Sequence, residues 1–153
     1  MSEQSCDNIM FEMGLYKAYF PKDLLYSEIH FWFKAHETGR TRVGLTAYAA
    51  RLLNDLFRIE WKVYVGETIL LEQMLGEVES AKAASELYTP MAGKLADINT
   101  AVLDDPSLVS LEPYAHWLLE FEGEPQNPMT PDAYSAFLAA GWEETVKMLK
   151  GQV

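Results

Sequence analysis

The sequence predicts a mainly β protein, a β-sandwich or flattened barrel with a few short helices and one helix at its C-terminal end. Short apolar runs rich in β-branched and aromatic residues alternate with turn residues along most of the chain, which is typical of sandwiches and barrels. The runs at 29–33 and 41–45, on either side of a turn at 37–40, are the clearest pair. Only the last stretch, which starts at Thr130-Pro131-Asp132, has a long helical pattern.

The remaining elements follow in order along the chain. Residues 1–20 mix polar and aromatic residues without clear periodicity, and we expect an N-terminal arm there. Further strands are predicted at 56–65, 68–74, 76–78, 87–90, 94–98 and 117–121. Short helices are predicted at 47–53, after Thr46 as N-cap, and at 106–109, where Pro106 follows Asp105. The C-terminal helix has a potential break at Gly141. The chain therefore divides into an arm (1–20), a main domain (21–128) and a helical tail (129–153).

Composition excludes several classes of protein. The chain has 153 residues, of which 49% are hydrophobic, so it can bury a core as a single domain. A formal net charge of −11 disfavours nucleic acid as a partner, because nucleic-acid binding depends on cationic contacts. No apolar run is long enough to span a membrane, and the N-terminus does not resemble a secretory signal. The single cysteine, Cys6, excludes an internal disulfide, and we expect a cytoplasmic location.

The most informative stretch is the predicted hairpin at 77–90. Apolar strand residues lead into a turn of small residues and out again, and Lys82 stands at the turn between Ala81 and Ala83. A lysine at such a tip is accessible to a modifying enzyme, and Glu79 and Glu86 are nearby. By its spacing alone, however, Lys82 also fits an ordinary surface lysine in a hairpin.

The segment Val78-Glu79-Ser80-Ala81-Lys82-Ala83-Ala84 resembles the lipoylation site of glycine cleavage H proteins, which reads V-E-S-x-K-A. Further motifs of that family appear in the same order between residues 23 and 121. Val43 to Ala49 resembles V-G-I-T-x-[YH]-A, and Pro90 to Gly93 resembles P-[VM]-[SA]-G. Gly66 and Gly93 stand at the family's spacing around the lysine, where we expect turns that help to present the hairpin.

The resemblance implies a lipoyl-domain-like fold, a hybrid barrel, and a non-catalytic carrier with lipoic acid bound covalently to Lys82. Glu79, Ser80, Ala81, Ala83 and Glu86 form the context of the modification site. A lipoate ligase, or an octanoyltransferase with a lipoyl synthase, would attach the group, and a dihydrolipoamide dehydrogenase would reoxidise it. Biotin is disfavoured because a biotinyl carrier has methionine on both sides of its lysine.

The chain departs from the family at the predicted groove for the arm, which the resemblance places at His30, Phe31, Trp32, Tyr48 and His116. The family's H-E-W triplet reads His30-Phe31-Trp32 here, so the carboxylate that helps to hold a cationic aminomethyl group is missing. We therefore favour a lipoate-binding protein of bacterial sulfur oxidation, with a heterodisulfide-reductase-like complex as partner. The alternatives are an H protein that serves the glycine cleavage enzymes, and an unmodified interaction domain.

Other residues carry weaker signals. His30, His36 and His116 lack the spacing of metal ligands, so no metal site is predicted. Cys6 is a candidate resolving thiol for a lipoyl disulfide, although a lone cysteine in an N-terminal arm is usually a bystander.

Overall fold

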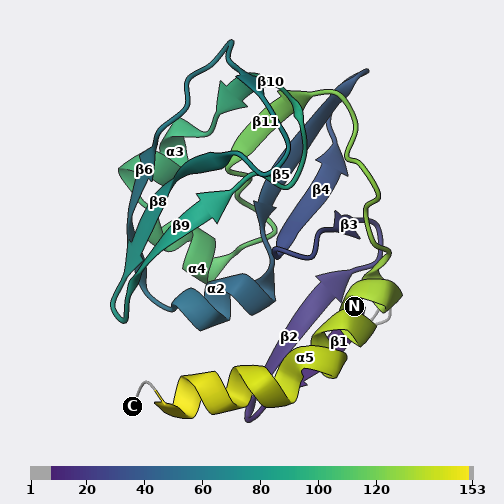
Figure 1. Ribbon diagram of the computed structural model, residues 1–153, viewed down its shortest axis with the longest axis vertical. Coiled ribbons are helices and arrows are strands. Elements are labelled where there is room, and N and C mark those ends of the chain that lie inside the picture. The colour runs from purple at the N-terminus through teal and green to yellow at the C-terminus, as the bar shows by residue number, and fades with distance from the viewer. Residues whose placement is uncertain (1–7, 152–153) are drawn as a thin grey trace.

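The computed structural model describes residues 8–151, with side chains described up to residue 145. Two sheets enclose the main core (Figure 1). A six-stranded sheet has the order β3-β4-β5-β11-β10-β7, and a three-stranded sheet has the order β6-β8-β9. The larger sheet consists of β3 (Leu25–Tyr26), β4 (Phe31–Ala35), β5 (Arg40–Leu45), β7 (Thr68–Ile69), β10 (Gly93–Ile98) and β11 (Leu119–Glu122). The smaller sheet consists of β6 (Leu56–Trp61), β8 (Met74–Ser80) and β9 (Ala84–Tyr88).

The first core lies between these two sheets. Phe33 and Val43 of the larger sheet and Leu75 and Val78 of the smaller one belong to the same buried cluster. Three short helices border it: α2 (Ala47–Leu53), α3 (Thr100–Asp104) and α4 (Ser107–Leu111). The predicted mainly β sandwich is therefore confirmed.

The second core is built from the two ends of the described chain. Strands β1 (Asn8–Met13) and β2 (Tyr16–Pro21) form an antiparallel hairpin that lies alongside α5 (Pro131–Gly151) in Figure 1. Phe11 packs edge-on against Trp142 with ring centroids 5.6 Å apart, and Phe20 packs in the same way against Tyr134 at 4.9 Å. Burial of these aromatic rings holds α5 against the hairpin and the body of the protein.

Residues 1–20 were expected to form an arm without clear periodicity, and for the described residues 8–20 the structure corrects this. Along β1 and β2 buried residues alternate with exposed ones, as in any strand with one covered face: Phe11 and Met13 point inward around Glu12, and Ala18 and Phe20 around Tyr19. The mixture of aromatic and polar residues is thus the inward and outward alternation of two paired strands. A two-residue loop between Met13 and Tyr16 joins them into a hairpin.

Two other predictions need correction, and one helix was missed. Helix α5 continues through Gly141, where no atom outside the helix crowds the glycine, so the helix tolerates it at a cost of about 1 kcal/mol relative to alanine. The strand expected at 68–74 ends at Ile69, because residues 70–73 form a turn in which the Gln73 N–H donates to the Leu70 carbonyl oxygen. Helix α3 was not predicted; the Asn99 side chain caps it by accepting from the Ala101 N–H.

No helix within the described residues is both long enough and apolar enough to cross a membrane. The short helix α2 begins as predicted after Thr46, whose hydroxyl oxygen accepts from the Ala49 N–H at 3.2 Å. It places Ala49 in the first core and Tyr48 in the second, and both residues border the same surface hollow as Ser80 and Ser85 of the β8–β9 hairpin.

A buried carboxylate joins β5 to β11. Glu120 is 2% exposed and accepts hydrogen bonds from Arg40 Nη1 at 2.9 Å and Arg42 Nε at 3.0 Å. Burial alone raises the pKa of the Glu120 carboxyl, but the hydrogen bonds from the two arginines and the nearby His36 outweigh burial and hold the pKa below its ordinary range.

Because the pKa of Glu120 is lower in the folded protein than in the unfolded chain, the carboxylate stabilises the fold above the unfolded pKa. This contribution is lost as the pH falls through the folded pKa, so stability is expected to drop on acidification below about pH 4. Urea unfolding at a series of pH values should show a shallower acid loss in Glu120→Gln than in the wild type. Equal slopes in the two proteins would contradict the role assigned to Glu120.

Candidate functional site

Lys82 lies at the tip of the β8–β9 hairpin, as the sequence predicts. Residues 81–83 connect the two strands, and Lys82 is exposed. Ser80 organises the turn: its N–H donates to the Ala83 carbonyl oxygen at 2.9 Å, and its hydroxyl lies 3.2 Å from the same oxygen and 3.4 Å from the Lys82 amide. The buried serine therefore fixes the direction in which the lysine side chain leaves the body of the protein.

The acidic residues near Lys82 are engaged with other groups. Glu79 forms an ion pair with Arg58, which also pairs with Glu60 two residues further along β6. The Glu86 carboxylate accepts from the Tyr88 hydroxyl at 2.8 Å. Within residues 8–145 the Lys82 ammonium makes no ion pair, so its amine is available to solvent and to a modifying enzyme.

Beside Lys82 the surface is hollowed by a cavity of about 390 Å³, which we call the hairpin hollow. Its walls come from β5, α2, the β8–β9 hairpin, the loop before β4 and, at one point, α5. The apolar part of the lining is formed by Ile29, Leu45, Ala49, Leu52, Leu53 and Leu87. The polar part includes His30, Tyr48, Ser85 and Thr145. An apolar group attached to Lys82 can leave water by entering this hollow.

His30 belongs to the polar part of the lining and has an unusual backbone conformation. Its φ of 71° is in the left-handed region, which residues other than glycine rarely adopt. The imidazole Nδ1 lies 2.9 Å from the Tyr134 hydroxyl, which lies 2.9 Å from the Thr46 hydroxyl. Burial lowers the pKa of His30 to about 4, so the ring is neutral near pH 7. Its ring also packs on that of Tyr48, with centroids 4.8 Å apart.

Three of the five predicted groove residues do not line the hollow. Phe31 is 1% exposed and belongs to the first core, whereas Trp32 belongs to the second. Successive residues of β4 point to opposite faces of the larger sheet, and both faces are covered, so both side chains are buried. The Trp32 indole N–H donates to the Pro113 carbonyl oxygen at 3.1 Å. His116 is half-buried in the loop before β11, away from the hollow.

The sequence did not point to several lining residues. Leu52 and Leu53 were assigned only to a short helix, and Thr145 lies in a helix beyond the segment where family motifs were found. The Tyr48 hydroxyl lies 3.4 Å from the Thr145 hydroxyl, so α5 joins α2 at the rim. The sequence pattern of α5 could indicate Thr145 only if the packing of α5 against α2 were already known, and that packing is a tertiary contact. Cys6 lies outside the described residues.

Gly66 and Gly93 are both at positive φ, 98° and 152°, but neither lines the hollow. The Gly66 N–H donates to the Leu95 carbonyl oxygen at 2.8 Å, and Gly93 pairs with Ile69 at the start of β10. Both glycines therefore support the larger sheet, whereas Lys82 is carried by the smaller one.

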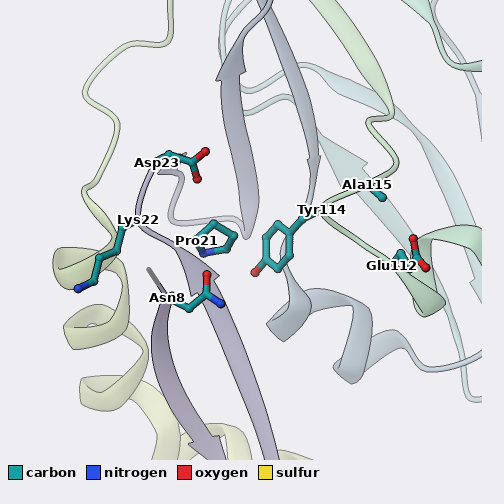
Figure 2. A pocket seen from close by; sticks show the side chains of 7 residues that line it. All are labelled: Asn8, Pro21, Lys22, Asp23, Glu112, Tyr114 and Ala115. Atoms are coloured by element: carbon teal, nitrogen blue, oxygen red, sulfur yellow. The ribbon is translucent and has the colours of Figure 1, made fainter. Parts of the chain in front are cut away.

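A larger and more polar hollow of about 930 Å³ lies elsewhere, between the N-terminal hairpin and the loop after α4 (Figure 2). It is lined by Asn8, Pro21, Lys22, Asp23, Glu112, Tyr114 and Ala115. Figure 2 shows the Tyr114 ring directed from that loop toward β2. The Tyr114 hydroxyl donates to the Tyr19 carbonyl oxygen at 2.6 Å and accepts from the Ala47 N–H at 3.0 Å. This contact links the hairpin to the start of α2 and, through α2, to the wall of the hairpin hollow.

A mainly β sandwich that presents one lysine at a hairpin tip, beside a hollow that can receive whatever the lysine bears, has the architecture of a cofactor carrier domain. Comparison with known proteins makes the class specific. The family model described as glycine cleavage H-protein matches residues 24–140. The chain belongs to the glycine cleavage H-protein family, whose members are lipoyl carriers.

Individual relatives agree with this assignment. The glycine cleavage system H protein of Thermobifida fusca is 40% identical over 118 residues, which cover 75% of this chain and 92% of the relative. That of Thermoanaerobacter sp. is 42% identical over 119 residues, covering 75% and 93%. A crystal structure of a glycine cleavage system H protein from Mycobacterium marinum superposes with a TM-score of 0.68 at 34% identity, covering 76% of this chain and 97% of that one.

These findings do not support the expectation of a sulfur-oxidation carrier, because the matching family model and the relatives named above are glycine cleavage H proteins. That expectation rested chiefly on Phe31 as a lining residue of the groove. Since Phe31 is part of the first core, its lack of a carboxylate does not describe the hollow that the arm would meet.

Proposed function

We propose that this protein is a lipoyl carrier of the glycine cleavage system, with lipoic acid joined to Lys82 and an aminomethyl group carried on that arm. The observation that supports the proposal best is the position of Lys82. It is exposed at a hairpin tip fixed by Ser80, it borders a hollow with an apolar wall, and it belongs to a chain of the H-protein family.

The residues present fit a lipoyl group. An amide bond to the lysine removes its charge and leaves a long, mostly apolar arm, which suits the leucine-lined part of the hollow. When bound, lipoic acid supplies a disulfide that opens to two thiols, one of which can bear a one-carbon group. The chain itself supplies position and protection from water, and it needs no catalytic base.

The proposed partners follow from this role. They are the glycine cleavage enzymes, a lipoate ligase or an octanoyltransferase with a lipoyl synthase, and a dihydrolipoamide dehydrogenase, all in the cytoplasm. The net charge of −11 favours partner surfaces that are basic around their active-site entrances, since opposite charge speeds encounter.

Modification at a single lysine tests the proposal. After co-expression with a lipoate ligase and lipoate, intact-mass spectrometry is expected to show one lipoyl group, and peptide mapping is expected to place it on Lys82. Lys82→Arg should abolish the mass shift and change the free energy of unfolding by less than ~0.5 kcal/mol, because the side chain is exposed. Lys94→Arg, an exposed lysine on β10, is the matched control and should be modified normally.

The lipoylated protein is then assayed for exchange of labelled bicarbonate into glycine with glycine cleavage partner enzymes. Exchange that depends on Lys82 is the expected result. Lipoylation without exchange would contradict the glycine cleavage assignment, and absence of lipoylation beside a modified H-protein control would leave the unmodified interaction domain as the better description.

A further inference from the structure

His30 occupies a position that the backbone adopts only at a cost. A non-glycine residue in the left-handed region loses roughly 1–3 kcal/mol, so the surrounding structure must hold it there. Its amide donates to the Ser27 carbonyl oxygen at 3.1 Å, and its carbonyl oxygen accepts from the Thr46 N–H at 3.1 Å. The result is an imidazole that borders the hairpin hollow while its Nδ1 faces the buried hydroxyls of Tyr134 and Thr46.

The direction of the hydrogen bonds in this buried row follows from the count of donors and acceptors. Thr46 is fully buried, and its hydroxyl oxygen already accepts from the Ala49 N–H. Within the described residues the partner left for the Thr46 hydroxyl hydrogen is the Tyr134 oxygen. With Thr46 donating to Tyr134, the phenol hydrogen goes to His30 Nδ1. The opposite direction leaves a buried hydroxyl hydrogen without an acceptor, at a cost of about 1–3 kcal/mol.

This direction fixes the tautomer of the imidazole. A neutral ring has one N–H, and Nδ1 is the acceptor, so the proton is on Nε2. No described residue is a partner for Nε2, and no buried side-chain nitrogen or oxygen of the described part lacks a partner. Nε2 therefore opens to accessible space, and the hollow is the space that His30 borders.

We propose that His30 is a positioning residue for the arm on Lys82: its Nε2–H, fixed by the row of Thr46 and Tyr134, donates a hydrogen bond to an acceptor on that arm. The acceptor is either the carbonyl oxygen of the lysine amide or a sulfur. An ammonium group is itself only a hydrogen-bond donor and cannot accept from Nε2–H, so the cationic end of a loaded arm lies away from His30. The contact with the arm rests on the proposed lipoylation of Lys82, but the tautomer of His30 is a property of the unmodified chain.

The unmodified protein tests the tautomer. Long-range ¹H–¹⁵N NMR spectra of the histidine side chains are expected to show His30 with the proton on Nε2 and with Nδ1 as a hydrogen-bonded acceptor. Tyr134→Phe removes the donor and should shift the Nδ1 resonance. Tyr26→Phe is the matched control, since it removes another buried tyrosine hydroxyl, which donates to the Pro21 carbonyl oxygen. A proton on Nδ1, or His30 resonances that do not move in Tyr134→Phe, would overturn the proposal.

Two modified forms test the contact with the arm. Octanoyl-Lys82 has the amide carbonyl but no sulfur, whereas lipoyl-Lys82 has both. A shift of the His30 Nε2–H signal in both forms assigns the carbonyl as acceptor, and a shift in the lipoyl form alone assigns a sulfur. If neither form moves the signal although mass spectrometry shows full modification, His30 does not position the arm, while Lys82 remains the attachment site.

Discussion

Phe31→Glu is expected to destabilise the protein by about 3 kcal/mol or more, instead of restoring a carboxylate to the hairpin hollow. The Phe31 side chain is 1% exposed and packs in the first core, and its strand partner across the sheet is the buried Leu45. Glutamate loses the packing of the ring and must also bury a carboxyl among the apolar side chains of the first core.

Chemical denaturation of the wild type and of Phe31→Glu measures this effect. Phe57→Glu is the matched control, because Phe57 is 58% exposed on β6 and the same substitution there should cost less than ~0.5 kcal/mol. A Phe31→Glu protein as stable as the wild type would mean that the new carboxylate reaches solvent. Residue 31 would then have to be regarded again as a lining residue of the arm groove, where it influences which group the arm can carry.

Gly93→Ala is expected to cost roughly 2–4 kcal/mol, the larger loss of a matched pair of glycine substitutions. At Gly93 φ is 152°, and an added Cβ would lie 2.4 Å from the Glu122 carbonyl oxygen, so β10 and β11 would have to separate. At Gly66 φ is 98° but no atom lies within 4 Å of an added Cβ, so Gly66→Ala should cost only about 1–2 kcal/mol of backbone strain.

Urea unfolding of the two variants gives the comparison, and equal losses would show that close approach to Glu122 is not what requires a glycine. The rate of lipoylation of the folded fraction tests whether Gly93 also helps to present the β8–β9 hairpin. If folded Gly93→Ala is lipoylated at the wild-type rate, the glycine supports packing of the larger sheet and does not help to present the β8–β9 hairpin.

The parts of the site that could be predicted from the sequence are the local ones. A hairpin tip is encoded by the small residues around Lys82 and by the strands that flank them, so its position was correct. The helix after Thr46 was correct for the same reason, since the cap and the helix are neighbours in the chain.

The residues that were misplaced depend on contacts between distant segments. Whether Trp32 faces a groove or a core depends on the hairpin at 8–21 and on α5, which cover that face of the larger sheet. The structure places His30 at the hollow, but neither its positive φ nor its contact with Tyr134 can be predicted from the sequence, because Tyr134 is more than a hundred residues away. Thr145 reaches the rim only through the same packing.

The pairing of the N-terminal hairpin with α5 has a consequence for synthesis on the ribosome. The hairpin at 8–21 is made well before Tyr134, Leu138 and Trp142, which cover its apolar face. Phe11 and Phe20 therefore lack these partners while the more than one hundred residues between the hairpin and Tyr134 are translated, an interval in which exposed apolar surface favours aggregation or chaperone binding. The hairpin with Lys82 is complete long before Thr145 is added. Under the proposed function, the hairpin that would be lipoylated is thus synthesised before the full lining of the hairpin hollow.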